Sequence, residues 1–139
     1  MKPHQTRVSV RYHESDQMGV VHHAVYVHYF EVARTTFMAE VGLDYAAMER
    51  RGVLLAVVDV GLRYLAPARF GDELIVETVV RKADRVRVRF DYRVLSDEEQ
   101  PRLLCEGHTL LACVNRDLRP QRLPEPDRER LLSVLAPES

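Results

Sequence analysis

The sequence contains no tryptophan, only two cysteines, and no apolar run of the roughly 20 residues that cross a membrane. Its first ten residues, MKPHQTRVSV, also lack the apolar segment of a signal peptide. We therefore expect no membrane insertion and a cytoplasmic location. Cys105 and Cys113 lie on one predicted strand, roughly 27 Å apart at ~3.4 Å per residue. That separation excludes a disulfide between them, and we predict that both are reduced core residues.

No charge of one sign dominates, because 20 basic and 21 acidic residues leave a formal net charge of −1. Such a balance predicts no nucleic-acid partner. The GxGxxG, Walker-type and GxSxG motifs are all missing, which excludes dinucleotide, P-loop and serine-hydrolase sites of those kinds. No repeat divides the chain. Its 139 residues, 46% hydrophobic and 29% charged, predict one globular domain over residues 1–139.

Short alternating segments joined by turns predict a sheet. The predicted strands are residues 7–13, 54–65, 73–82, 85–95 and 103–115. In the second of them, Val58, Val60, Leu62 and Tyr64 are expected to share one face. Short connections between consecutive strands favour antiparallel pairing. One helix should then cover the concave face of the sheet, which makes the fold class α+β.

That helix is predicted from about His23 to Val41, with Gly42 at its C-terminal cap. Its polar residues fall along one side by helical spacing, namely His28, Glu31, Arg34 and Thr35. An apolar arc covering the rest predicts a helix that protein surrounds on most sides. Two shorter helices are expected at residues 45–50 and 124–135.

The most informative segment is DQMGVVHHAVYVHYFEVAR, residues 16–34. Asp16 precedes a glycine turn at Gly19, and a helix begins a few residues later. Asp16 has two interpretations: a turn-forming residue, a common use of aspartate in loops, or a nucleophile or general base. Unpaired N–H groups at the start of the helix could stabilise an oxyanion on an adjacent carbonyl. This grouping predicts an enzyme that acts on an activated acyl group.

The histidines of this segment and the arginines further along the chain are weaker indications of function. A helical zinc site usually places histidines at i and i+4, a spacing that His22, His23 and His28 do not have, so we predict no metal site. His28 is expected on the polar stripe or at an interface. The alternating arginines 85, 87, 89 and 93 could meet the phosphates of a large cofactor, but a regular alternation on a strand favours a solvated face.

The sequence resembles the hotdog-fold acyl-CoA thioesterases of the 4-hydroxybenzoyl-CoA thioesterase family, especially the YbgC-type branch. The resemblance rests on YHESDQMGVVHHAVYVHYFEVART, where Asp16, Gly19, Val21, His23, Tyr26 and Arg34 match the family signature. RYLAPARFGDEL at residues 63–74 is a second segment typical of this branch, and agreement extends over about residues 5–132. The resemblance implies a five-stranded antiparallel sheet wrapped around one long central helix.

The resemblance also implies roles for individual residues. Asp16 would be the catalytic carboxylate, and the backbone N–H of His23, at the start of the central helix, would polarise the thioester carbonyl. In this branch the His23 side chain is also associated with activity. The substrate would contact Gly19, Val20, Val21, His22 and Tyr26. Coenzyme A is part of the substrate, and no separate cofactor is expected.

Assembly and substrate follow from the same resemblance. Family members pair through the edge strand that follows the helix, here residues 54–65, as a homodimer or a homotetramer, with the site at the subunit boundary. The function predicted is hydrolysis of acyl-CoA to a carboxylic acid and free CoA. Two alternatives stay open: a thioesterase specific for aromatic, 4-hydroxybenzoyl-type acyl groups, and a non-catalytic acyl-CoA-binding hotdog protein.

Overall fold

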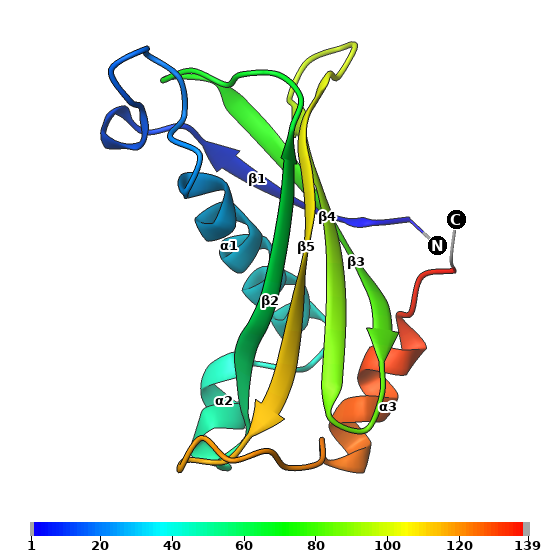
Figure 1. Ribbon diagram of the computed structural model, residues 1–139. Coiled ribbons are helices and arrows are strands. Elements are labelled where there is room, and N and C mark those ends of the chain that lie inside the picture. The colour runs from blue at the N-terminus through cyan, green and yellow to red at the C-terminus, as the bar shows by residue number, and fades with distance from the viewer. Residues whose placement is uncertain (1, 138–139) are drawn as a thin grey trace.

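The computed structural model describes residues 2–137, which form one antiparallel sheet of five strands (Figure 1). The strand order across the sheet is β1-β3-β4-β5-β2. The strands are β1 (His4–Ser9), β2 (Leu54–Tyr64), β3 (Glu73–Ala83), β4 (Arg87–Ser96) and β5 (Leu103–Val114). The helices are α1 (Val25–Glu40), α2 (Tyr45–Arg50) and α3 (Glu125–Ser133), with a 3-10 turn, η1 (Tyr12–Glu14). The predicted five-stranded antiparallel sheet is confirmed.

The first strand lies earlier in the chain than its alternation predicted. β1 ends at Ser9, and Val10 is buried outside the strand, with its N–H donating to the Asp72 carbonyl at 2.9 Å. Tyr12, which falls within the strand predicted over residues 7–13, belongs to η1 instead and is 76% exposed. The buried carboxylate of Glu14 explains the turn, because it accepts hydrogen bonds from the Arg11 N–H and from the Tyr29 hydroxyl.

Helix α1 packs on the sheet through one face. Its buried residues recur at helical spacing and are Tyr26, Tyr29, Phe30, Ala33, Arg34, Phe37 and Met38. Phe30 stacks on Tyr92 of β4 with ring centroids 4.3 Å apart. The prediction that protein surrounds α1 on most sides is wrong for the single chain, because one sheet covers only one side of a helix. Arg34 also leaves the predicted polar stripe, since it is buried and donates to the Tyr92 hydroxyl at 3.4 Å.

The edge strand β2 contains a bulge that resets its two faces. Its pairing with β5 shifts between Val57 and Asp59, which leaves Val58 as the extra residue. Val60 pairs with Thr109 and Tyr64 pairs with Cys105. Thr109 and Cys105 are both buried on the face of the sheet against which α1 packs. Val58 is the extra residue of the bulge, outside the regular pairing, and is 56% exposed, whereas Val60, Leu62 and Tyr64 alternate onto one face as predicted.

This inner face of β2 is only partly covered. Val57, Val60 and Tyr64 are 48%, 37% and 50% exposed although they lie on the concave side of the sheet. α1 instead makes its sheet contacts mainly with β1 and β3. The described chain thus leaves an apolar strip open along its free edge.

Two remaining expectations are confirmed. Gly42 follows the end of α1 with φ of +87°, a backbone conformation that suits glycine at a helix C-terminus. Cys105 and Cys113 are free and buried in β5, and burial raises the pKa of the Cys105 thiol to about 12. None of the helices within residues 2–137 is long and apolar enough to cross a membrane.

Candidate active site

The segment that follows η1 forms a tight loop around Asp16. Its ends meet in an antiparallel bridge between Ser15 and Val21, and Gly19 takes a φ of +78° that few other residues adopt. The backbone N–H of Gly19 donates to the Asp16 carbonyl at 3.0 Å, and the N–H of Asp16 donates to the Val20 carbonyl at 2.8 Å. Gly19 is therefore required for the turn itself.

The half-buried side chain of Asp16 stabilises this loop with one oxygen. Its Oδ1 accepts from the N–H of Met18 at 2.8 Å and from the N–H of Val20 at 3.4 Å. No hydrogen bond to Oδ2 forms within residues 2–137. The turn-forming interpretation of Asp16 is thus correct for Oδ1, and Oδ2 has no hydrogen-bond partner among the described residues.

His22 and His23 lie between the loop and α1. Their rings stack with centroids 4.2 Å apart, and the Nδ1 of His22 accepts from the N–H of Ala24 at 3.2 Å. α1 begins at Val25, two residues after the predicted start near His23, and residues 23 and 24 form a turn. Physically, Ala24 offers no capping side chain, so the His22 carbonyl starts the helix by accepting from the Val25 N–H at 2.9 Å.

His23 nevertheless presents a free donor beside the helix. No backbone carbonyl in the described part of the chain accepts from its N–H. Its own carbonyl accepts from the Tyr64 hydroxyl at 2.9 Å, which ties the turn to the end of β2. An N–H held in this way beside a helix N-terminus suits a developing oxyanion.

A first hollow, of about 300 Å³, opens next to His23 and is called the apolar hollow below. It is lined by Val20, Val21, His23, Tyr26, Tyr64, Leu65, Ala66 and Pro67. Tyr26 and Tyr64 meet edge to face with centroids 5.6 Å apart, and burial raises the pKa of Tyr26 to about 12. Tyr64, Leu65 and Pro67 were missed as site residues, although the second family-like segment, residues 63–74, contains all three.

A second hollow, of about 730 Å³, lies on the Asp16 side of the loop and is called the loop hollow. It is lined by Tyr12, His13, Ser15, Asp16, Gln17, Gly19 and Phe70. Asp16 and His23 therefore line different hollows on either side of one loop. Val20, Val21 and Tyr26 lie with His23, Gly19 lies with Asp16, and His22 contacts the site through its ring stacked on His23.

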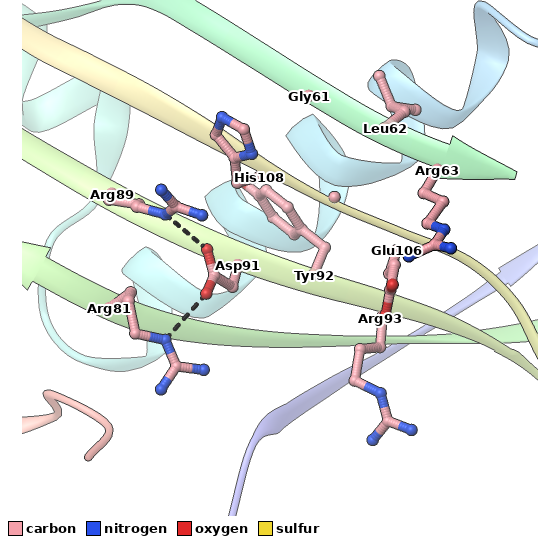
Figure 2. Close-up of a pocket in the computed structure, with 11 residues that line it drawn as sticks. Gly61, Leu62, Arg63, Arg81, Arg89, Asp91, Tyr92, Arg93, Glu106 and His108 are labelled. Atoms are coloured by element: carbon pink, nitrogen blue, oxygen red, sulfur yellow. Dashed lines mark hydrogen bonds and ion pairs between the residues drawn. The ribbon is translucent and has the colours of Figure 1, made fainter. Parts of the chain in front are cut away.

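The arginine-rich face lies apart from both hollows, on the outer face of the sheet (Figure 2). Asp91 accepts from Arg81 and Arg89, each at 2.9 Å, and Arg93 pairs with Glu77 at 3.2 Å. Arg85, Arg87 and Arg93 are exposed, and Arg89 is half-buried. The solvated-face interpretation of the arginines thus agrees with the structure.

The described residues, 2–137, contain no group of three or more His, Cys, Asp or Glu side chains placed to hold a metal ion. His28 is exposed on α1, away from the stacked pair His22 and His23.

A family model described as the thioesterase-like superfamily matches residues 10–133. The chain belongs to this superfamily. The acyl-CoA thioester hydrolase YbgC of Escherichia coli O6:H1 is 32% identical over 119 residues, 85% of this chain and 87% of YbgC. The acyl-acyl carrier protein thioesterase ATL3 of Arabidopsis thaliana is 29% identical over 132 residues, 95% of this chain and 69% of ATL3. The YneP protein of Bacillus subtilis is 37% identical over 87 residues, and the match spans 63% of either chain.

Solved structures agree with this thioesterase-like assignment. A hypothetical protein TT1821 from Thermus thermophilus superposes with a TM-score of 0.89 at 41% identity, covering 96% of this chain and 98% of that one. The DHNA-CoA thioesterase from Staphylococcus aureus superposes with a TM-score of 0.86 at 32% identity, covering 93% and 87%. The predicted hotdog fold is confirmed.

Proposed function

We propose that this thioesterase-like protein hydrolyses acyl-CoA to a carboxylic acid and free CoA. The observation that carries the proposal is that the Oδ2 of Asp16 and the N–H of His23 both lack a partner in the described chain and flank the tight loop that the Ser15–Val21 bridge closes. One supplies the base or nucleophile and the other the oxyanion donor that thioester cleavage needs. The names of YbgC and of the Staphylococcus aureus enzyme support the same chemistry.

In the proposed reaction the thioester carbonyl oxygen accepts from the His23 N–H. An oxygen, either of Asp16 or of a water that Asp16 deprotonates, bonds to the carbonyl carbon, and the carbon–sulfur bond breaks. CoA leaves as its thiol after taking a proton. If Asp16 attacks directly, water then hydrolyses the acyl-aspartate anhydride and restores the carboxylate. Val20, Val21 and Tyr26 would contact the acyl group, Gly19 would keep the loop tight, and His22 would support His23.

An aromatic acyl group is the second candidate substrate. The edge-to-face pair of Tyr26 and Tyr64 lines the apolar hollow, and aromatic pairs favour a further ring in such geometry. The name of the Staphylococcus aureus enzyme, a DHNA-CoA thioesterase, points the same way.

The site is proposed to be completed by a second copy of the chain. The open apolar strip of Val57, Val60 and Tyr64 lies on the edge strand, whose unpaired backbone groups invite another strand. A two-fold pairing of β2 with its copy would extend the sheet and cover the strip. Tyr64 belongs to both the strip and the apolar hollow, so the pairing of β2 with its copy would also form one side of the acyl-binding hollow.

Thiol release from a panel of short-chain, long-chain and aromatic acyl-CoA substrates tests the function. We expect turnover of at least one class, with the preferred class identifying the acyl group. Binding of every substrate without thiol release would instead indicate a non-catalytic acyl-CoA-binding protein. The reaction should also survive exhaustive EDTA treatment, and a loss that zinc restores would contradict a metal-free mechanism.

A further inference from the structure

Two large aromatic side chains stand exposed at the rim of the loop hollow. Tyr12 is 76% exposed and Phe70 is 59% exposed, yet their rings meet edge to face with centroids 5.5 Å apart. Aromatic residues seldom lie so far into solvent, and paired apolar surface of this kind marks a binding site more often than a single exposed residue does.

The backbone beneath these rings is held in place on both sides. Tyr12 begins η1, which the buried Glu14 fixes through its bond from the Arg11 N–H. On the other side, the N–H of Gly71 donates to the Val10 carbonyl and the N–H of Asp72 donates to the Arg69 carbonyl. The pair Tyr12 and Phe70, called the aromatic shelf below, is therefore preorganised for a ligand.

The shelf borders the same hollow as Asp16, together with the polar side chains of His13, Ser15 and Gln17. An acyl-CoA bound at Asp16 extends from its thioester in two directions, as the acyl group and as the pantetheine arm. The apolar hollow is lined by Tyr26, which is 3% exposed, and by other apolar side chains, and so suits the acyl group. The loop hollow is lined by polar and aromatic side chains and is the larger of the two, about 730 Å³ against about 300 Å³.

We propose that the aromatic shelf of Tyr12 and Phe70 binds the pantetheine arm of the substrate. This proposal rests on the function proposed above and adds which hollow receives which half of the thioester. The rings contact the methylene and gem-dimethyl groups of the arm, and the polar side chains of the loop hollow bond to its amides. Arg11 and Arg69, exposed chain neighbours of the shelf, form no ion pair within residues 2–137 and leave positive charge near the phosphate end of the arm.

The same arm occurs in CoA and in acyl carrier proteins. Relatives of both kinds, YbgC and ATL3, match this chain. Comparing wild-type turnover of one acyl group on CoA and on a carrier protein identifies which source this protein uses.

The test is the double variant Tyr12→Ala/Phe70→Ala assayed on thioesters of one acyl group with shortened arms. On acyl-CoA and on acyl-pantetheine we expect kcat/KM to fall about tenfold, mostly through KM, as the loss of aromatic contacts implies. On the N-acetylcysteamine thioester, which lacks most of the arm, variant and wild type should converge. Leu118→Ala, an equally exposed control at 73% in the loop after β5, should match wild type on all three substrates.

An equal loss on all three substrates would overturn the proposal, as would no loss on acyl-CoA. A loss on acyl-CoA that disappears on acyl-pantetheine would assign the shelf to the nucleotide and also overturn it. Light scattering on the variant adds a further check, because dissociation of an oligomer would show that a second chain covers the shelf. Failure of the wild type to cleave any thioester would overturn the proposed function itself, which distinguishes the two failures.

Discussion

Asp16 uses its two carboxylate oxygens differently. Oδ1 holds the loop through the N–H groups of Met18 and Val20, whereas Oδ2 has no partner in the described chain. Asparagine has the same size and keeps one carbonyl oxygen, so it can retain the loop while losing the negative charge. The loop-stabilising role of Asp16 and its proposed catalytic role can therefore be tested separately, because they depend on different oxygens.

For Asp16→Asn we expect thiol release to fall at least about a hundredfold, within the range of 10²–10⁴ for general-base catalysis. CoA binding should persist because the loop persists. Asp72→Asn is the matched control: Asp72 Oδ2 also caps a nearby turn, through the Arg69 N–H at 2.8 Å. If Asp16→Asn turns over acyl-CoA as well as Asp72→Asn does, Asp16 is not catalytic.

Buried thiol and phenol groups predict how the fold responds to alkali. Burial raises the pKa values of Cys105 and Tyr26 to about 12, above their ordinary values of 9.0 and 10.0. The folded chain therefore keeps these protons at a pH where the unfolded chain releases them, so stability is full below about pH 9 and falls as pH rises toward 12. Thermal unfolding followed from pH 7 to pH 11 should show this decline, with a smaller slope in Cys105→Ala. A midpoint that stays constant to pH 11 would contradict it.

At the scale of elements, α1 and β5 approach each other at Gly107. A Cβ on Gly107 would lie 2.3 Å from the Gly61 carbonyl oxygen and 2.8 Å from the Phe30 ring. A Cβ on Gly61 would meet the His108 ring at 2.4 Å. Backbone cannot move aside locally, whereas the His108 side chain can rotate and give up only its 2.8 Å contact with Asp59.

Gly107→Ala should therefore lower the free energy of unfolding by about 1–3 kcal/mol, the usual cost of overpacking a core. Gly61→Ala should cost less. Urea denaturation of both variants measures the difference, and equal destabilisation would show that the contacts around Gly107 relax as readily as the His108 side chain does.

The helices and strands also show how much of the fold can be predicted from sequence patterns. Strict alternation located β4, and helical spacing with a C-terminal glycine located α1 to within two residues. The start of α1 was misplaced because Ala24 carries no capping signal, and the backbone bond from Val25 to His22 cannot be seen in a pattern. The bulge at Val58 is equally invisible, since a run of valines satisfies either register.

The candidate site was predictable only in part for a similar reason. Asp16, Gly19 and His23 lie within eight residues of one motif, so their proximity in the sequence already indicated that they lie close together in space. Tyr64 and Phe70 reach the two hollows from a distant segment, and only the pairing of strands brings them there. The exposure of Tyr12 depends on η1, a short turn fixed by the buried Glu14 rather than by local propensity.

At the scale of the whole molecule, the open strip on β2 predicts an oligomer. A proline at Val58 would be a weak probe, because the bulge already lacks a regular ladder and tolerates proline. Val60→Lys is sharper: it places a charge on the inner face where a second copy should bury it. An unpaired buried charge costs about 3–5 kcal/mol, so the dimer dissociation constant should rise at least about a hundredfold.

Light scattering and thiol release on the same samples should show a monomer with reduced activity. Leu132→Lys is the matched control, because Leu132 on α3 has the same exposed fraction as Val60, 37%. A monomeric Val60→Lys protein with full activity would show that each chain carries a complete site. A Leu132→Lys protein that also dissociates would place the interface elsewhere.

The bulge in β2 gives the strand an unusual tolerance to changes in length. Val57 pairs with Leu111 and Asp59 pairs with Leu110. The paired residues of β5 are therefore consecutive, as they would be if Val58 were missing. Deleting any ladder residue of β2 would exchange the two faces of everything beyond it. Deleting the Val58 codon would instead yield an uninterrupted ladder, with Val57 and Val60 still inward and Asp59 still outward. Within this strand, position 58 is where an inherited one-codon deletion would leave the protein's architecture intact.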